Sequence, residues 1–323
     1  MKAILCIRYG PPEAVLELHE VEKPVAKDNE VLVKIHAASA NTLDLQMKGG
    51  AARLWGGLRR PRDPRLGRDI AGRVEAVGNS VTQFHPGDEV FGACEGAFAE
   101  YACAREAGLA LKTAKGSFEE AATLPVAAIT ALQGLRDAGQ IKAGQKVLIY
   151  GATGGVGTFA MQIAKAFGAE VTGVCSTRNL DLVRSLGADY VIDYTQEDFT
   201  KSRQRYDLIL AVNGYRPISA YRRALTPQGI YMAAGGSLAQ ISEALLLGPL
   251  MSRIGSNVLG FMGIAKINQK DLNFLNELLE ARKVVPAIDR RYPLSKTGEA
   301  LQYLGEGHAR GKVVITVAQD SNA

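Results

Sequence analysis

A glycine-rich segment of this chain has the residue types and the spacing that hold a phosphate. The sequence ATGGVG at residues 152–157 follows the apolar run KVLIYG and precedes apolar residues that recur at helical spacing up to Phe167. One glycine lets the backbone approach a pyrophosphate, another lets the helix pack closely on the sheet, and the helix N-terminus attracts phosphate through its free N–H groups and its dipole. We therefore predict a dinucleotide site formed by Ala152, Gly154, Gly155, Val156 and Gly157.

The residues at the end of the next predicted strand indicate which dinucleotide is bound. The segment Cys175-Ser176-Thr177-Arg178 stands where NAD-preferring sites place an Asp or Glu that accepts from the ribose 2′-hydroxyl. A carboxylate would repel a 2′-phosphate, whereas Arg178 can pair with one in a bidentate way and Ser176 can donate to it. The segment therefore favours NADPH over NADH. The alternative interpretation is that Arg178 is a solvated charge at the start of a helix.

The elements that must position these residues are alternating strands and helices in the middle of the chain. From near Ser117, strand-like runs such as EVTGVC, YVIDY and YDLILAVN are separated by helix-like segments, which predicts a parallel sheet with helices on both faces. Residues 1–120 instead show short strand-like runs broken by Gly and Pro, as in a mostly antiparallel, barrel-like domain. Near the end, NQKDLNFLNELLEARKV predicts an amphipathic helix, and GKVVITV a final strand that rejoins the first domain. The predicted fold class is α/β.

Composition and charge exclude several classes of protein. The 323 residues predict two domains, and 47% apolar with 22% charged residues is ordinary for a soluble globular chain. No segment reaches the roughly 18 apolar residues that span a bilayer, and the N-terminus meets a charge and two prolines too early for a signal peptide. The net charge of +5 is not gathered into a nucleic-acid-binding tail, and the four cysteines form no CxxC pair. We expect a cytoplasmic protein that binds neither nucleic acid nor membranes.

Several segments together resemble the medium-chain dehydrogenase/reductase superfamily, and within it the zinc-free quinone oxidoreductase branch. They are LGRDIAGRVEAVG (66–78), FHPGDEVFG (84–92), GAFAEYA (96–102), AATLPVAAITALQGL (121–135), the glycine-rich segment, LVRSLGADYVIDY (182–194) and GHARGKVVI (307–315). Within the branch, LGRD and STRN look most like the reticulon-interacting-protein group. The resemblance implies a GroES-like β-barrel catalytic domain over 1–120 and 264–323, a Rossmann NADP-binding domain over 121–263, and a homodimer.

The resemblance also implies how the rest of the cofactor is held. Matched position by position, Thr130 contacts the nicotinamide carboxamide, Tyr194 flanks the 2′-phosphate beside Ser176, and a loop at 260–263 closes over the nicotinamide. The residues implied in this way are Thr130, Tyr194, Asn213, Ala234, Gly235, Phe261 and Met262. Loops at 47–66 and 238–262 are expected to select the acceptor.

The zinc ligands of metal-dependent relatives are replaced in this chain. Asn41 stands where those relatives carry a cysteine, and Gly67-Arg68-Asp69 stands where they carry Gly-His-Glu. An arginine cannot ligate zinc because its guanidinium stays protonated, so we predict no metal site. Asn41 becomes the candidate catalytic residue, as a hydrogen-bond donor or a substrate-positioning group; the alternative is a turn residue that bonds its own backbone. Asp44 is favoured as a helix-start residue over a catalytic acid.

Without a Lewis acid, reduction of an electrophilic acceptor is favoured over oxidation of an alcohol. A quinone or an enone mainly needs a well-oriented nicotinamide and a donor for the developing oxyanion or enolate. We therefore predict an NADPH-dependent enzyme that transfers a hydride to a quinone or an α,β-unsaturated carbonyl. One alternative is an enoyl-thioester (CoA) reductase that uses the arginines 53, 59, 60, 62, 65 and 68, although such a run is also typical of a solvated loop. Another is a non-catalytic NADPH-binding partner protein.

Overall fold

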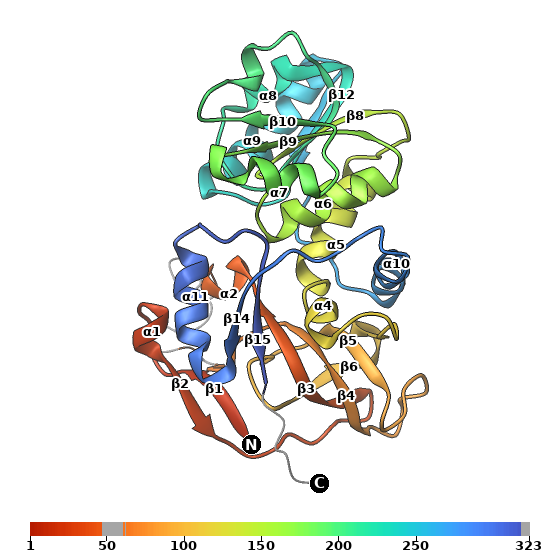
Figure 1. Ribbon diagram of the computed structural model, residues 1–323, viewed down its shortest axis with the longest axis vertical. Coiled ribbons are helices and arrows are strands. Elements are labelled where there is room, and N and C mark those ends of the chain that lie inside the picture. Colours follow the sequence, from red (N-terminus) through yellow and green to blue (C-terminus); the bar gives the residue numbers. More distant parts are fainter. Residues whose placement is uncertain (47–60, 62, 318–323) are drawn as a thin grey trace. The chain divides into compact units, whose positions relative to one another are not determined.

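The computed structural model describes residues 1–46, 61 and 63–317 (Figure 1). Contacts divide the chain into two compact units. Unit 1 comprises Met1–Ala127, Ile267–Arg282 and Pro286–Ala323, and unit 2 comprises Ala128–Lys266 and Lys283–Val285. These limits lie a few residues after the predicted domain boundaries, 120/121 and 263/264. The predicted α/β fold class is confirmed.

Unit 1 is built on a seven-stranded sheet in the order β14-β15-β3-β4-β5-β7, with β6 also paired to β3. All of its strand pairs are antiparallel except β14 with β15. The final strand pairs with β3, so its predicted return to the first domain is confirmed. A separate two-stranded sheet joins β1 to β2. The strands are β1 Lys2–Cys6, β2 Leu16–Glu20, β3 Glu30–Ala40, β4 Asp69–Val77, β5 Glu89–Ala93, β6 Tyr101–Arg105, β7 Leu109–Leu111, β14 Ile288–Pro293 and β15 Lys312–Thr316.

Short helices complete unit 1, and one of them shows how its start is specified. Helix α4 is capped by Ser117, whose side chain accepts from the backbone of Glu120 while the Glu120 side chain accepts from the backbone of Ser117. The predicted amphipathic helix near the C-terminus is confirmed as α10. The helices of unit 1 are α1 Pro12–Val15, α2 Thr42–Gln46, α4 Phe118–Ala122, α10 Gln269–Glu280 and α11 Thr297–Gly305, with 3-10 turns η1 Glu106–Gly108 and η5 Leu294–Lys296.

Unit 2 is a six-stranded, fully parallel sheet in the order β10-β9-β8-β11-β12-β13, as predicted. Its central strands are nearly continuous apolar runs because helices cover both faces. The strands are β8 Lys146–Tyr150, β9 Glu170–Cys175, β10 Tyr190–Asp193, β11 Tyr206–Ala211, β12 Leu225–Ala233 and β13 Val258–Phe261. The helices are α5 Pro125–Gln133, which begins in unit 1, α6 Gly155–Ala166, α7 Leu180–Ser185, α8 Ile218–Ala224 and α9 Leu238–Ile254, with short helices η2 Gly134–Ala138, η3 Thr177–Asn179 and η4 Phe199–Lys201.

Two predicted loops, 238–262 and 260–263, differ from the structure, and most of the third, 47–66, lies outside the described residues. Most of the segment 238–262 is a 17-residue helix, α9, followed by strand β13, and Gly260 and Phe261 lie in that strand rather than in a loop. Two features hid this helix. The Gly248-Pro249 pair is typical of a turn, and α9 is apolar on nearly every side, so it lacks the polar face that marks an amphipathic helix. Ser237 nevertheless caps the helix by accepting from the backbone of Gln240.

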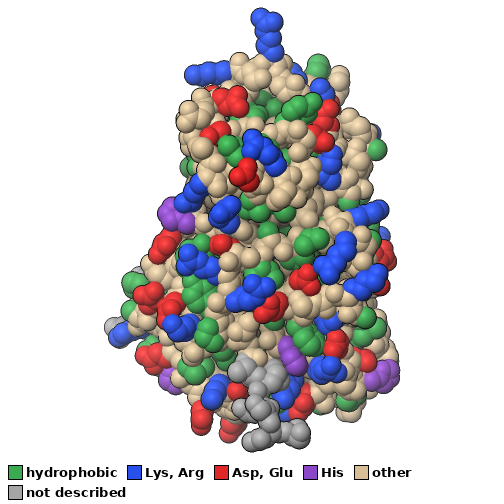
Figure 2. Space-filling model, viewed as in Figure 1, with side chains coloured by type: hydrophobic (Ala, Val, Ile, Leu, Met, Phe, Trp, Pro, Cys, Tyr) green, Lys and Arg blue, Asp and Glu red, His purple; other side chains and the backbone are tan. Residues whose placement is uncertain are grey.

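Charged side chains of both signs are interspersed on the face of the molecule that Figure 2 shows. Lys and Arg (blue) alternate there with Asp and Glu (red) and form no broad patch of a single sign (Figure 2). No helix among the described residues has both the length and the apolarity needed to cross a membrane.

Candidate functional site

Within unit 2, the predicted cofactor residues lie along one edge of the parallel sheet, where the strands end. The glycine-rich segment follows β8, at the centre of the sheet. Ser176 and Arg178 follow β9 and Tyr194 follows β10, on one side of β8, whereas Asn213, Ala234 and Met262 follow β11, β12 and β13 on the other side. Ligands of open parallel sheets bind at this edge, where the chain reverses the direction in which it adds strands. The edge is therefore arranged for an elongated ligand whose middle lies at β8.

The two key glycines of the segment serve different purposes. A Cβ at Gly157 would lie 2.1 Å from the carbonyl oxygen of Gly151 and 2.8 Å from the carbonyl carbon of Ala152, so this position has no room for a side chain. A Cβ at Gly154 would meet no atom within 4 Å. The helix therefore needs Gly157 for packing, whereas Gly154 leaves open space that a side chain would fill and that suits the close approach of a pyrophosphate.

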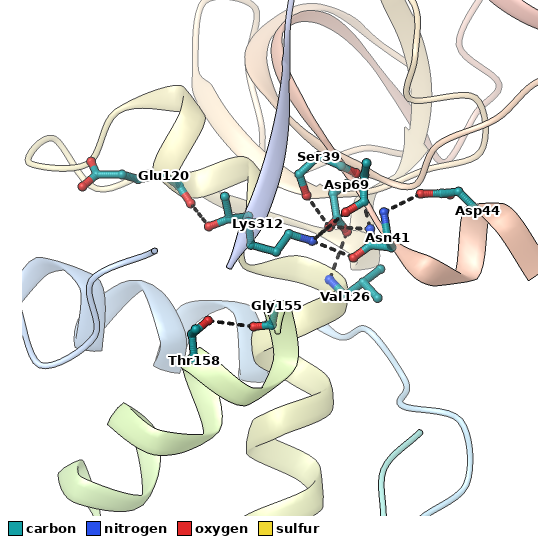
Figure 3. A network of polar contacts seen from close by, with 11 residues as sticks. Ser39, Asn41, Asp44, Asp69, Glu120, Val126, Gly155, Thr158 and Lys312 are labelled. Atoms are coloured by element: carbon teal, nitrogen blue, oxygen red, sulfur yellow. Dashed lines mark hydrogen bonds and ion pairs between the residues drawn. The ribbon is translucent and has the colours of Figure 1, made fainter. Parts of the chain in front are cut away.

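Helix α6 begins directly at this open space. The Thr158 amide is a helical donor to the Gly154 carbonyl oxygen, at 2.9 Å, and the Thr158 hydroxyl donates to Gly155 O at 3.0 Å (Figure 3). The amides that precede Thr158 are the first N–H groups of the helix, and helical geometry offers them no acceptor. Gly155 and Val156 are half-buried, so phosphate oxygens can reach their amides.

The structure brings together the residues predicted to hold the 2′-phosphate. The backbone N–H of Tyr194 donates to Cys175 O at 3.0 Å, which holds Tyr194 next to the end of β9, where Ser176 follows. Arg178 and Tyr194 are exposed and Ser176 is half-buried. The Ser176 hydroxyl accepts from Asn179 Nδ2 at 3.2 Å, so its own proton can be donated to a ligand.

An acidic residue that the sequence pattern did not indicate, Asp193, also lies beside the end of β9. It ends β10 opposite Cys175. One carboxylate oxygen accepts from the Thr177 hydroxyl at 2.6 Å, and the other accepts from the backbone and the hydroxyl of Thr195, at 3.0 and 2.7 Å. The hydrogen bond from Thr177, followed by those from Thr195, keeps the pKa of Asp193 below its usual range against the opposing effect of burial. Asp193 thus ties the turn after β9 to the turn after β10, and both of its carboxylate oxygens already accept hydrogen bonds.

At the other end of the edge, backbone contacts fix the residues predicted to surround the nicotinamide. The Ala234 amide donates to Ala211 O at 2.8 Å, and the Met262 amide donates to Ala233 O at 3.0 Å. A Cβ at Gly134 would lie 3.2 Å from the Met262 sulfur, so Met262 lies beside the start of η2. The remaining predicted residues here are Thr130 in α5, Asn213 after β11, Gly235 after β12 and Phe261 at the end of β13.

In unit 1, Asn41 belongs to a buried polar network (Figure 3). Its Nδ2 donates to Asp69 Oδ2 at 2.9 Å and makes a long contact of 3.4 Å with Ser39 O, and its Oδ1 accepts from Lys312 Nζ at 2.6 Å. Asp69 also accepts from the Ser39 hydroxyl at 2.8 Å and from the Val126 amide at 3.0 Å. Asn41 therefore does not simply bond its own backbone, because its amide joins three separate segments of unit 1.

The network contains one ammonium and, with Asp44, two buried carboxyl groups. Lys312 and Asp69 form an ion pair at 3.3 Å and are 2% and 0% exposed. Burial lowers the pKa of Lys312, and the charge and hydrogen bond of Asp69 oppose this. No pattern in the sequence marked Lys312, because a lysine that begins a strand is ordinarily solvated.

Asp44 is confirmed as a helix-start residue. Its Oδ2 accepts from the Asn41 backbone N–H at 2.8 Å, and the Asp44 amide donates to Asn41 O at 2.9 Å. Burial raises the pKa of Asp44 to about 7; the Asn41 hydrogen bond opposes this, the Asp69 charge adds to it, and Lys312 and Arg68 oppose it. Asp44 therefore titrates near neutrality while it holds the start of α2.

The residues at the position of a family zinc site do not fit a zinc ion. Arg68 forms an ion pair with Glu95 at 3.0 Å, and the Asn41 oxygen faces an ammonium that would repel a metal cation. Within residues 1–46, 61 and 63–317, no three His, Cys, Asp or Glu side chains are grouped so that they could hold a metal. The absence of a catalytic zinc stays a prediction.

The predicted arginine cluster is only partly described. Residues 53, 59, 60 and 62 lie outside the described residues. Arg65 pairs with Asp63 at 2.8 Å and Arg68 with Glu95 at 3.0 Å. The two described arginines are thus already paired with carboxylates.

Comparisons with known proteins identify the families to which parts of the chain belong. Residues 27–134 match a family model described as the alcohol dehydrogenase GroES-like domain, and residues 186–315 match one described as zinc-binding dehydrogenase. The chain is 33% identical to the mouse NAD(P)H oxidoreductase RTN4IP1, mitochondrial, over 98% of this chain and 89% of that protein. It is 35% identical to the tomato 2-methylene-furan-3-one reductase, over 98% of this chain and 79% of that protein.

A solved structure, the quinone oxidoreductase from Coxiella burnetii, matches with a TM-score of 0.87 at 32% identity and covers 98% of this chain and 99% of its own. The GroES-like and Rossmann-type folds implied by the resemblance are confirmed. The chain belongs to the medium-chain dehydrogenase/reductase superfamily, and it is an NAD(P)H oxidoreductase of that type, related to quinone oxidoreductases and to the RTN4IP1 proteins.

Proposed function

We propose that the protein is an NADPH-dependent, zinc-independent reductase that transfers a hydride to a quinone or to an α,β-unsaturated carbonyl compound. The observation that carries the proposal is that the predicted cofactor residues lie in a row along the carboxyl ends of six parallel strands, with the open space at Gly154 in its middle. Two relatives support the acceptor class, since one is a quinone oxidoreductase and the other a 2-methylene-furan-3-one reductase.

In this proposal, unit 2 holds and orients the cofactor. When bound, NADPH supplies the hydride. The amides at the start of α6 receive the pyrophosphate, Ser176 and Arg178 receive the 2′-phosphate, and Thr130 and Asn213 orient the nicotinamide end. The task of Asp193 is then to join the two turns, because both of its carboxylate oxygens already accept from Thr177 and Thr195.

The proposed task of Asn41 is to stabilise the negative charge that forms on the acceptor oxygen. Asn41 Nδ2 carries two hydrogens. One is donated to Asp69, and the other has only the 3.4 Å contact with Ser39 O, which is near the limit of a hydrogen bond. This second N–H is the one that Asn41 can offer to an oxyanion or enolate. Hydride addition to the β-carbon of an enone breaks the π bond of the carbon–carbon double bond and moves the negative charge to the carbonyl oxygen as an enolate, whose α-carbon then takes a proton from water.

An acceptor screen tests the proposal. Purified protein is mixed with NADPH and with a simple quinone, an enal or crotonyl-CoA, and NADPH oxidation is followed by absorbance. We expect turnover with the quinone or the enal. A dominant rate with crotonyl-CoA would favour the enoyl-thioester reductase, although the described arginines that motivated it pair with Asp63 and Glu95. Oxidation at the background rate across the panel would favour a non-catalytic NADPH-binding protein.

Replacing Arg178 with Asp should reverse the cofactor preference. The variant removes the proposed phosphate partner and adds a carboxylate beside the 2′-position, so we expect kcat/KM with NADPH to fall by roughly 100-fold while kcat/KM with NADH changes little. Steady-state kinetics with both cofactors checks this. Arg184→Asp, an exposed arginine in the next helix that pairs with Asp181, is the matched control. An unmutated protein that already prefers NADH would contradict the NADPH assignment.

We also propose that two copies associate through the edge of unit 2. Strand β13 is the last strand of its sheet and has one partner among the described strands. Helix α9, just before it, exposes Leu246, Leu250 and Ile254 at helical spacing, to 75%, 55% and 75%. Antiparallel pairing of β13 with the same strand of a second copy satisfies both edges by two-fold symmetry and covers both leucine surfaces. The proposed occupant of this surface is therefore a second copy of the chain.

The double substitution Leu246→Asp and Leu250→Asp should yield a monomer. It places four charges in the proposed two-fold interface, two from each copy, where they would be buried without partners. Sedimentation velocity at matched concentrations gives the measurement. Val25→Asp, which changes an apolar residue of unit 1 that is 85% exposed, serves as the control and should stay dimeric. An unmutated protein that sediments as a monomer would rule the dimer out. The cytoplasmic location expected from the sequence stays a prediction.

A further inference from the structure

The side-chain amide of Asn41 is held between two buried groups of opposite charge. Its oxygen lies 2.6 Å from the Lys312 ammonium, and its nitrogen lies 2.9 Å from a carboxylate oxygen of Asp69 (Figure 3). The three residues come from the end of β3, the start of β4 and the start of β15. All three are buried, so water screens these charges little.

An asparagine amide has nearly the same shape in its two orientations, so its neighbours decide which end is the donor. In the observed orientation, Lys312 donates to the oxygen and Asp69 accepts from the nitrogen. Rotation by half a turn would place N–H groups against the ammonium and the amide oxygen against the carboxylate. Both contacts would then be repulsive, so the pair of charges specifies one orientation.

We propose that Lys312 is a positioning residue for the hydride-transfer reaction: its charge fixes the Asn41 amide so that the N–H end is available to the acceptor oxygen. This inference rests on the proposed function, in which Asn41 stabilises an oxyanion or enolate. A reversed amide would offer lone pairs to that oxygen and repel it. The positive charge beside Asn41 therefore selects a donor rather than an acceptor.

Lys312 acts through Asn41 and not on the acceptor itself. An ammonium has three N–H donors, and those of Lys312 face Asn41 Oδ1 at 2.6 Å, Ala40 O at 3.3 Å and Asp69 Oδ2 at 3.3 Å. No donor is left for a ligand. Removing the charge should therefore change turnover only as far as Asn41 contributes to it.

A double-mutant cycle tests this dependence. Lys312→Met removes the charge and keeps the aliphatic stem. We expect kcat for quinone or enone reduction to fall by roughly 10- to 100-fold, less than the roughly 100- to 1,000-fold that direct loss of an oxyanion donor costs, with KM for NADPH unchanged. In an Asn41→Ala background, the same substitution should change kcat by less than about twofold. Equal losses in both backgrounds would overturn the inference.

Two further variants keep the test decisive if Lys312→Met does not fold, because it leaves Asp69 buried without a cation. Lys312→Met combined with Asp69→Asn removes both charges, and the same cycle is run with it. Lys312→Arg keeps the charge and should retain kcat within a few-fold; a folded Lys312→Arg as slow as the Met variants would show that charge is not the cause. Lys112→Met is the matched control, since the Lys112 side chain is 4% exposed, pairs with Glu89 at 2.9 Å and has no hydrogen bond to Asn41. The kcat of this variant should stay unchanged.

Amide orientation also has a readout that needs no turnover. The protein is labelled with nitrogen-15 in its asparagine side chains. The NMR signals of the Asn41 amide are identified as those that disappear in Asn41→Ala. We expect slow hydrogen exchange at these signals in the unmutated protein and faster exchange, with a changed chemical shift, when Lys312 is replaced by Met. If the unmutated protein turns over no acceptor, the proposed function fails, and these signals still decide whether Lys312 orients Asn41. Unchanged signals in a folded Lys312→Met protein would refute the inference directly.

Discussion

Gly157→Ala should destabilise the folded protein, whereas Gly154→Ala should leave its stability unchanged or slightly higher. Gly157→Ala places a Cβ 2.1 Å from Gly151 O, a backbone atom that cannot rotate away, so we expect a loss of about 3 kcal/mol or more in the free energy of unfolding. Gly154→Ala meets no atom within 4 Å, and its φ of −78° and ψ of 173° are ordinary for alanine. Its stability should be unchanged, or higher by about 0.5 to 1 kcal/mol.

The affinity for NADPH should fall in Gly154→Ala, although its stability does not. The new methyl group fills the space proposed for the pyrophosphate and removes the close approach of the backbone. Loss of one charge-assisted hydrogen bond weakens binding by roughly 10- to 100-fold. Denaturant unfolding and NADPH fluorescence titration measure the two quantities on both variants. A Gly154→Ala protein that binds NADPH as tightly as the unmutated one would remove the main support for the pyrophosphate assignment.

The sequence allowed those parts of the site to be predicted that follow from local patterns. The glycine segment, the strand before it and the helix after it lie within about one supersecondary unit, and each has its own signal: an apolar run, a close-packing glycine and helical periodicity. Ser176 and Arg178 were found in the same way, because they follow the next strand directly. The resemblance then supplied Thr130, Asn213 and the positions at the later strand ends.

The parts that could not be predicted depend on contacts between distant segments. Asn41, Asp69 and Lys312 are separated by up to 271 positions and meet only because β3 pairs with both β4 and β15. Asp193 lies 15 residues beyond Arg178 in sequence, yet parallel pairing places it opposite Cys175. A rule that searches only the end of one strand for an acid does not detect a carboxylate from the neighbouring strand.

Helix α9 illustrates a different limit. A surface helix is recognised by its apolar stripe, and α9 has apolar residues on almost every side, with a proline inside it. Such a composition is explained if two of its faces are covered, one by its own sheet and the other by a partner. The failure to predict this helix and the proposed dimer surface therefore have a common physical origin.

The pH dependence of stability should change when Asp44 is replaced by Asn. Burial raises the pKa of Asp44 in the folded protein from 3.8 to about 7. Below about pH 4, the group is protonated in both states and its contribution to stability is fully present. As pH rises from about 4 to about 7, only the unfolded chain loses the proton, so stability falls; above about 7 both states are ionised and the loss is complete. Three pKa units correspond to about 4 kcal/mol.

Asp44→Asn keeps an oxygen that can accept from the Asn41 amide but cannot ionise. Relative to this variant, the unmutated protein should therefore lose up to about 4 kcal/mol between pH 4 and pH 7, measured as unfolding midpoints in denaturant across that range. Asp189→Asn is a control in which the pH dependence should run the other way. Burial raises the pKa of Asp189, but the hydrogen bonds from Lys165 and Val171 together lower it below its usual value. Its variant should lose stability at neutral pH and not at acidic pH. If the midpoints of Asp44→Asn and the unmutated protein run parallel from pH 4 to pH 7, Asp44 does not titrate near neutrality, and the buried network carries both carboxylates ionised beside its single ammonium.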